Sequence, residues 1–173
     1  MEELGDHKQL MREIVALSEA NTWEVAKHEW SLHEIGECDE YGDERCLCGH
    51  PIREMCWLTN RLNGRRALVG NHCVTKFLGI RSDLIFTCMK RLLDDSEKAM
   101  NAETIEYAYE QGWISVREME FSSDTLHKRN LSFKQARWRR AINERVLSFA
   151  DLRRASRRHE LRQSKLEPAA AAV

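Results

Sequence analysis

The densest cluster of cysteines most constrains the fold of this chain. Four of its six cysteines lie within the 28 residues from Cys46 to Cys73, in the stretch CLCGHPIREMCWLTNRLNGRRALVGNHC, together with two histidines. Cys46 and Cys48 flank a single leucine and precede Gly49, which allows a tight turn to bring two thiolates to one ion. This pattern predicts a zinc knuckle.

A hairpin is expected directly after the knuckle. Asn63-Gly64 lies between two apolar runs, and this pair supplies the positive φ angles of a type I′ turn. We therefore predict antiparallel strands over about 54–61 and 66–70.

A helix is expected to carry the next cysteine. The segment NHCVTKFL is typical of a helix start, with Asn71 as its cap. The positive potential of a helix N-terminus favours a thiolate at Cys73. A knuckle, a hairpin and a helix that returns a ligand follow one another in a treble-clef zinc finger, so we predict a site for Zn²⁺.

A structural zinc site needs four nitrogen or sulfur ligands in a tetrahedron. Cys46, Cys48 and Cys73 supply three of them. We predict Cys56, at the start of the first hairpin strand, as the fourth ligand. The alternatives that remain open are His50, His72 and Cys38. Cys88 falls on the apolar face of an expected helix, and we assign it to the core.

The rest of the chain favours an α+β fold that is mainly helical, with the knuckle and hairpin packed among several helices. Asp6 and Gln9 form a capping-box pattern that predicts a first helix over about 7–20. The segment 23–30 is expected to be helical and to lead into a short strand. Ser82 is expected to cap a helix whose apolar face holds Leu84, Ile85, Cys88, Leu92 and Leu93. A further helix over about 102–111 should end at Gly112.

The clearest helix follows Ser132 and Gln135, which form a second capping box. Its apolar face is marked by Leu131, Trp138, Ile142, Val146, Phe149 and Leu152. These elements suggest an N-terminal helix with the zinc unit over 1–95, a helical region with a basic C-terminal helix over 96–166, and a disordered tail over 167–173.

Charge is unevenly distributed along the chain, although the formal net charge is only −1. Residues 1–50 contain 13 Asp and Glu against 4 Lys and Arg, whereas residues 128–165 contain 13 Lys and Arg against 3 Asp and Glu. Such asymmetry is typical of nucleic-acid binding, or of two ends that attract each other within one fold. The candidate phosphate contacts are Arg137, Arg139, Arg140, Arg145, Arg153, Arg154, Arg157 and Arg158. Arg65 and Arg66 at the hairpin tip are further candidates, and Trp57 and Trp138 are candidates for base stacking or for the core.

The N-terminal segment MEELGDHKQLMRE has neither a basic start nor an apolar core, so we expect no secretory signal and a reducing cytoplasm. No run of about 18 apolar residues occurs, so we expect no membrane span.

The motifs C-x-C-G-H-P-I, N-R-x-N-G and V-G-N-H-C-V-x-K-F, with LSFKQ…INERV downstream, resemble a family of small, mostly uncharacterised proteins of bacteriophages and related mobile elements. The resemblance covers about residues 23–148. It implies a metal site at Cys46, Cys48, Cys56 and Cys73, and an origin in a phage or prophage.

No motif of a known enzyme class is found: neither H-E-x-x-H, nor the zinc deaminase pattern, nor a P-loop, nor G-x-S-x-G. His72 is the only candidate general base of an HNH-type nuclease, and no second histidine follows at a suitable spacing. We therefore expect a protein that is not an enzyme and that binds nucleic acid, DNA or RNA, through its basic C-terminal helix. The alternative is a phage protein that binds a host protein of transcription, replication or defence.

Overall fold

The structure is a computed structural model that describes residues 2–38 and 42–166, with side chains described over 7–38 and 42–150. The chain divides into two compact units, Met1–Phe86 and Thr87–Val173. The fold is α+β and mainly helical, as predicted. The division falls within helix α4 (Ser82–Asp94), whereas the sequence suggested a boundary after residue 95. The segment 167–173, expected to be a tail, lies outside the described residues.

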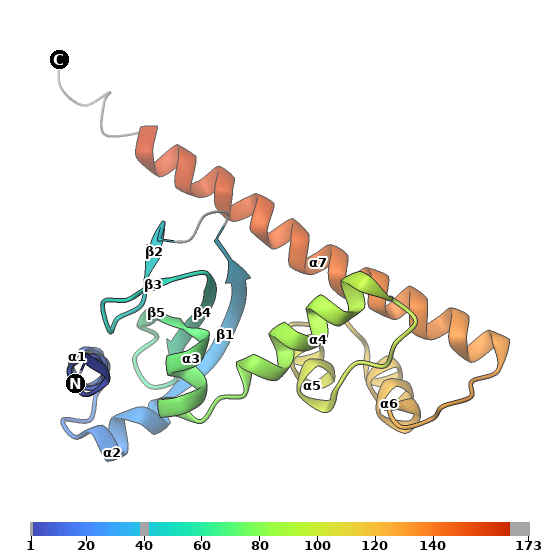
Figure 1. The fold of residues 1–173 in the computed structure, drawn as a ribbon, viewed down its shortest axis with the longest axis horizontal. Helices are drawn as coiled ribbons and strands as arrows, with labels where there is room; N and C mark the ends of the chain where they lie inside the picture. Colours follow the sequence, from blue (N-terminus) through green and yellow to red (C-terminus); the bar gives the residue numbers. More distant parts are fainter. Residues whose placement is uncertain (1, 39–41, 167–173) are drawn as a thin grey trace. The chain divides into compact units, whose positions relative to one another are not determined.

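A three-stranded antiparallel sheet forms the centre of the first unit (Figure 1), in the order β1-β4-β5. Its middle strand alternates between buried and half-buried positions, because successive side chains of a strand point to opposite faces. Cys56, Leu58 and Asn60 are the buried set. The strands are β1 (Trp30–Glu37), β4 (Glu54–Asn60) and β5 (Arg66–Gly70).

The first helix, α1 (Glu2–Leu17), buries Leu10 and Ile14 completely in the core of this unit. This helix was predicted correctly, but the predicted capping box at Asp6 is wrong. Asp6 lies inside a helix that has already begun at Glu2, so it is not a cap.

The segment after α1 was predicted correctly as a helix followed by a strand. It forms α2 (Trp23–Ala26), a 3₁₀ turn η1 (Lys27–Glu29) and then β1. The buried carboxylate of Glu29 accepts hydrogen bonds from the amides of Glu19 and Ala20 and, at 2.6 Å, from the Asn60 side chain. Burial raises the pKa of Glu29, but these bonds outweigh it and lower the pKa below its ordinary value. Glu29 thereby ties the end of α1 to the sheet.

The hairpin between β4 and β5 was predicted correctly, but its turn is not type I′. Gly64 has a positive φ of 72°, whereas Asn63 does not, and five residues separate the strands. The Asn60 side chain accepts bonds from the amides of Leu62 and Asn63, and the Gly64 amide bonds to the Asn60 carbonyl. A side chain therefore shapes this longer loop.

The segment after β5 forms α3 (Asn71–Cys73), which continues into a π-helical turn η2 (Val74–Leu78). Asn71 is the first helical residue and not the cap, so that expectation is wrong. The Asn71 side chain instead donates to Glu54 at 2.7 Å and accepts from Ser82 at 2.6 Å. The apolar face expected for α4 is correct except at Leu93, which is 58% exposed.

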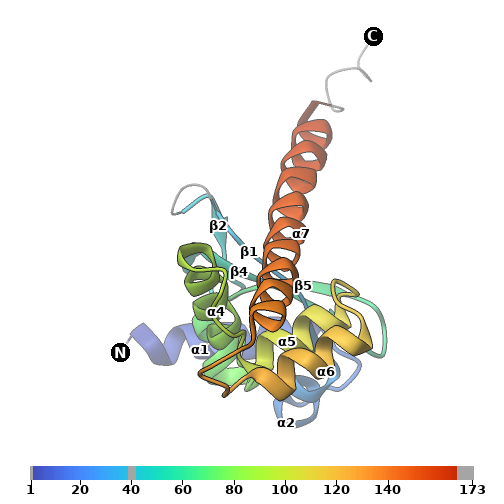
Figure 2. The ribbon, with the colours of Figure 1, turned by 90° about the vertical axis from the view of Figure 1, so that its right-hand side faces the viewer.

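The second unit contains three further helices, and Figure 2 shows α5 beside α6. Side chains cap each of them: Asn101 for α5, Ser115 with Glu118 for α6, and Ser132 with Gln135 for α7. The last box was predicted, whereas α6 was missed. The helices are α5 (Ala102–Glu110), α6 (Val116–Thr125) and α7 (Phe133–Leu166).

The start of α7 packs through most of the predicted face, although Phe149 is 36% exposed. Ile142 and Val146 are buried, and Trp138 stacks on Phe121 with ring centroids 4.2 Å apart. Asn143 donates to the carbonyls of residues 96 and 98, which fixes the segment before α5. The side chain of Leu152 lies outside the described ones.

Candidate metal centre

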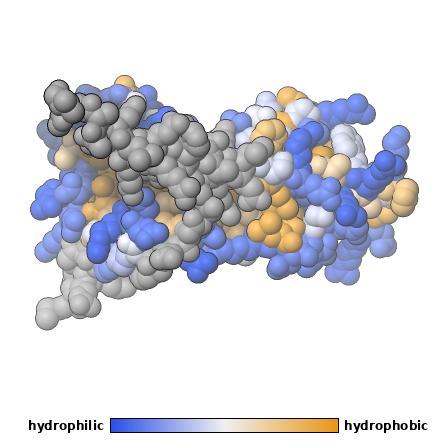
Figure 3. Space-filling view, turned by 90° about the horizontal axis from the view of Figure 1, so that it is seen from above, coloured by the Kyte–Doolittle hydropathy of each residue, from blue (hydrophilic) through white to orange (hydrophobic). Residues whose placement is uncertain are grey.

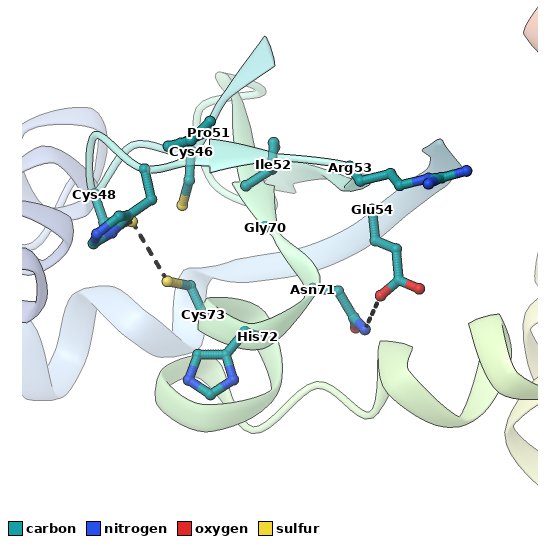
Figure 4. Close-up of a pocket in the computed structure, with 11 residues that line it drawn as sticks. Cys46, Cys48, Pro51, Ile52, Arg53, Glu54, Gly70, Asn71, His72 and Cys73 are labelled. Carbon is teal, nitrogen blue, oxygen red and sulfur yellow. Dashed lines mark hydrogen bonds between the residues drawn. The ribbon is translucent and has the colours of Figure 1, made fainter. Parts of the chain in front are cut away.

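Three of the predicted zinc ligands lie together. The sulfurs of Cys46, Cys48 and Cys73 are all within 4.8 Å of one another, and Cys48 and Cys73 are 3.7 Å apart (Figure 4). A Zn–S bond of about 2.3 Å at the tetrahedral angle gives a sulfur–sulfur distance of about 3.8 Å. The cluster could therefore hold a metal ion between the knuckle and α3.

A tight turn presents the first two sulfurs. The Gly49 amide donates to the Cys46 carbonyl and the Cys46 amide to the His50 carbonyl, while Gly49 takes a φ of 94°. The turn is closed by the short strands β2 (Glu44–Arg45) and β3 (Pro51–Ile52), which pair antiparallel. The order of knuckle, hairpin and helix is the order predicted from the sequence.

Gly70 allows the third cysteine to approach the other two. A Cβ added at Gly70 would lie 2.8 Å from Cγ2 of Ile52 and 3.9 Å from Cβ of Cys46. The chain of β5 thus passes against the knuckle with no room for a side chain, and α3 begins at the next residue. The glycine therefore sets the distance between Cys73 and the knuckle.

The three thiols influence one another strongly. The pKa of Cys46 is lowered to about 6, because it accepts a hydrogen bond from Cys73 and, despite burial, further bonds from the amides of Gly70 and Cys48. The pKa of Cys73 is raised because it donates that bond and lies next to the Cys46 sulfur. Burial raises the pKa of Cys48. Negative charge on all three sulfurs requires a nearby cation.

The structure does not bring Cys56 into this group. Cys56 lies on the buried face of β4, between Ile35 on β1 and Val69 on β5, and is fully buried. Burial raises its pKa to about 12, although a hydrogen bond with Ser82 opposes this. Its surroundings are those of a core thiol.

The three alternative ligands lie in different places. His50 is exposed, and its Nδ1 is 3.6 Å from the sulfur of Cys48. His72 is also exposed, and Figure 4 shows its ring turned away from the sulfurs. Cys38 is buried beyond the end of β1, where its amide donates to the carbonyl of Arg53. Neither Cys38 nor Cys88, which is buried on α4, belongs to the sulfur group.

A polar network that the sequence analysis missed supports the start of α3. Glu54, Asn71 and Ser82 are joined by two hydrogen bonds, from Asn71 to Glu54 and from Ser82 to Asn71. The network links β4, α3 and α4, and its member on α3, Asn71, is in the same helical turn as Cys73. No local signal marks it, because its members are far apart in the sequence.

The candidate phosphate-binding arginines of α7 differ in what they contact. Arg140 pairs with Glu144 and Glu97, and Arg145 pairs with Glu118. Arg139 donates to the carbonyl of Thr125, whereas Arg137 is exposed. The side chains of Arg153, Arg154, Arg157 and Arg158 lie outside the described ones.

The remaining candidates sit on the hairpin and in the aromatic contacts. Arg65 and Arg66 are exposed at the hairpin tip, where Arg65 donates to the carbonyl of Ala16. Trp57 is half-buried on β4. The Trp138 ring stacks on Phe121 and contacts the Arg117 guanidinium, so it already has two partners on α6.

No family model, curated protein or solved structure matches the chain. Among the helices that the structure describes, none combines the length and the apolar character needed to cross a membrane.

Proposed function

We propose that the protein is a zinc-binding protein in which one structural zinc ion joins the knuckle to α3. The observation that carries this proposal is the set of three sulfurs within 4.8 Å of one another, held by two elements that are separated by a hairpin. Cysteine thiolates favour zinc among the common divalent ions of cells, and zinc accepts the tetrahedral arrangement that their spacing fits.

We also propose that the ion has a structural role and that the protein is not an enzyme. Gly70 and the network of Glu54, Asn71 and Ser82 hold the start of α3 against the knuckle, which suits a closed site. A metal held in this way contributes directly to folding.

Nucleic acid is the partner that we propose for the whole chain, with the basic end of α7 as the contact. Its support is the excess of Lys and Arg over 128–165 and the exposure of Arg137. Since Arg140 and Arg145 are engaged with glutamates, the contact depends on Arg137 and on the four arginines from 153 to 158. In the view of Figure 3, hydrophilic residues cover much of the coloured surface and hydrophobic ones form separate patches, which favours recognition by charge.

The metal part of the proposal is tested by metal analysis of the purified full-length protein. We expect about one zinc ion per chain. Replacement of Cys73 by serine should release it, whereas replacement of Cys88 by alanine should not. A wild-type preparation that binds no zinc at micromolar concentrations would overturn the proposal.

The nucleic-acid part is tested by the salt dependence of binding to duplex DNA and to RNA. Each phosphate contact should contribute about −0.9 to the slope of log K against log salt on duplex DNA. Replacement of Arg153, Arg154, Arg157 and Arg158 by alanine should flatten this slope, while replacement of Arg140 and Arg145 should change it much less. If the wild type binds neither nucleic acid at low salt, the partner is not a nucleic acid, and a host protein becomes the better hypothesis.

A further inference from the structure

We infer that Nδ1 of His50 is the fourth ligand of the metal ion, so that the site is Cys46-x-Cys48-x-His50 with Cys73. This inference rests on the proposed zinc site and assigns the one position that the sulfur cluster leaves open. It replaces the four-thiolate site, including Cys56, that the sequence favoured.

The first argument is distance. A tetrahedral zinc ion with bonds of about 2.3 Å to sulfur and 2.0–2.1 Å to nitrogen places these two atoms about 3.6 Å apart. Nδ1 of His50 lies 3.6 Å from the sulfur of Cys48. The Cys48–Cys73 distance of 3.7 Å fits the expected sulfur–sulfur distance in the same way. The two distances that involve Cys48 therefore match edges of the tetrahedron.

The second argument is the path of the chain. The amide of Cys46 donates to the carbonyl of His50, so the knuckle turn closes between these two residues. His50 consequently follows the turn that presents both knuckle sulfurs, and its side chain lines the same pocket as the three cysteines. Its Nδ1 is not among the atoms that lie within 4.8 Å of one another. Rotation of this exposed side chain about its two torsions can bring the ring to the ion.

The third argument comes from the other candidates. Cys56 would have to leave the buried face of β4, where it is fully buried and shares a hydrogen bond with Ser82. The ring of His72 is turned away from the sulfurs (Figure 4). Movement of Cys56 would break the core of the sheet, whereas His50 is exposed and already lies beside Cys48.

A nitrogen ligand changes the charge of the site. Three thiolates and a neutral imidazole around Zn²⁺ carry a net charge of −1, whereas four thiolates carry −2. A ring coordinated through Nδ1 keeps its proton on Nε2, so it presents a hydrogen-bond donor to the surface. The less negative site is then repelled less strongly by the carboxylate of Glu54, which lines the same pocket.

Cobalt substitution tests the ligand set directly in the full-length protein. Co²⁺ replaces zinc in tetrahedral sites, and its absorption distinguishes three thiolates with one nitrogen from four thiolates. We expect the three-thiolate spectrum for the wild type and for Cys56→Ala. The variant His50→Ala should lose that spectrum and weaken zinc binding by more than about 100-fold, beyond the loss typical of residues that only support a ligand. His72→Ala is the matched control, because it removes an exposed histidine next to Cys73, and we expect its zinc affinity to be unchanged.

The outcomes separate this inference from the proposal on which it rests. A wild type that binds neither zinc nor cobalt contradicts the metal site itself. A four-thiolate spectrum that is lost in Cys56→Ala and kept in His50→Ala leaves the zinc site standing and overturns His50 as its ligand. His50 is equally overturned if His50→Ala keeps the wild-type spectrum and affinity, because water or another residue then fills the fourth position. Circular dichroism of each variant with excess zinc shows whether a lost spectrum reflects a lost fold.

Discussion

The two units differ in how their helices begin. In the second unit, α5, α6 and α7 each start at a side chain that caps the helix: Asn101, Ser115 and Ser132. In the first unit, α2 and α3 start at Thr22 and Gly70, and neither makes a side-chain cap bond. The first unit instead contains the sulfur cluster and the contacts of Glu29 and Asn60, which join segments far apart in the chain. Local caps thus set where these helices of the second unit begin, whereas contacts between distant segments, with the proposed metal, position the helix starts of the first.

The largest expected effect is the loss of a cysteine ligand. Cys73→Ser should abolish zinc binding and unfold much of the first unit, because structural zinc contributes roughly 10–16 kcal/mol in small zinc-finger peptides. Far-ultraviolet circular dichroism should retain the signal of the second unit. Cys88→Ala serves as the control, since that thiol lies in the second unit. A variant at Cys73 with wild-type zinc content and melting would contradict the role of the cluster.

A smaller effect is expected from Gly70→Ala. The new methyl group would lie 2.8 Å from Ile52, a branched side chain that cannot move away easily. We expect a loss of about 1–3 kcal/mol from the first unit, as is typical of overpacking, together with weaker zinc binding. Gly36→Ala is the matched control, because its Cβ would meet only the flexible end of Met55 at 3.4 Å. Chemical denaturation and zinc titration measure both effects. Equal losses in the two variants would show that the close approach at Gly70 is unimportant.

Removal of a helix cap should affect the second unit alone. Ser115→Ala removes the side chain that bonds to the Glu118 amide at the start of α6. We expect a loss of about 1 kcal/mol, the usual cost of a lost cap, with zinc affinity unchanged. Ser123→Ala, an exposed position on the same helix, is the control and should be neutral. Hydrogen exchange of peptides from α6 measures the difference. A change in zinc affinity in Ser115→Ala would contradict the independence of the two units.

The smallest expected effect concerns how the stability of the second unit depends on pH. Burial raises the pKa of Glu118, but bonds from Arg145 and Ser115 outweigh it and lower the pKa below its ordinary value. Glu118 therefore stabilises the folded state above its unfolded pKa, and this contribution is lost as the pH falls through the lower, folded pKa. The hydrogen-exchange protection of α6 should fall on going from neutral to acidic pH in the wild type. We expect this fall to be smaller in Glu118→Gln. Identical pH profiles for the wild type and Glu118→Gln would contradict this assignment.

The same comparison explains which features the sequence could predict. The capping box at Ser132 and the end of α5 at Gly112, whose φ is 70°, are local signals, and the structure agrees with them. Ser115 and Glu118 formed the same pattern, so α6 could have been found in the same way. Asp6 shows the opposite error, because a matching pattern also occurs inside a helix.

The errors in the first unit have long-range causes. The Asn63-Gly64 turn was predicted as type I′, but the Asn60 side chain, itself bonded to Glu29, imposes a longer loop. Asn71 was expected to be a cap, whereas its side chain bonds to Glu54 and Ser82.

The candidate site shows which ligands can be identified from the spacing of cysteines in the sequence. Cys46, Cys48 and Cys73 were chosen from their spacing around a hairpin, and the structure brings them together. Spacing alone could not choose among the candidates for the fourth position. The alternation of β4, with Cys56 on the same buried face as Leu58, is the sequence feature that argues for a core position.

Hydrogen exchange of the full-length protein, measured with zinc bound and after its removal by a chelator, tests the central claim most directly. Removal of the metal should strip protection from the knuckle, the β4–β5 hairpin and α3, because the ion joins these elements. Protection in α5, α6 and the first half of α7 should stay unchanged, because their caps and core do not involve the metal. Equal protection of the knuckle with and without zinc, or loss of protection across both units together, would contradict the account.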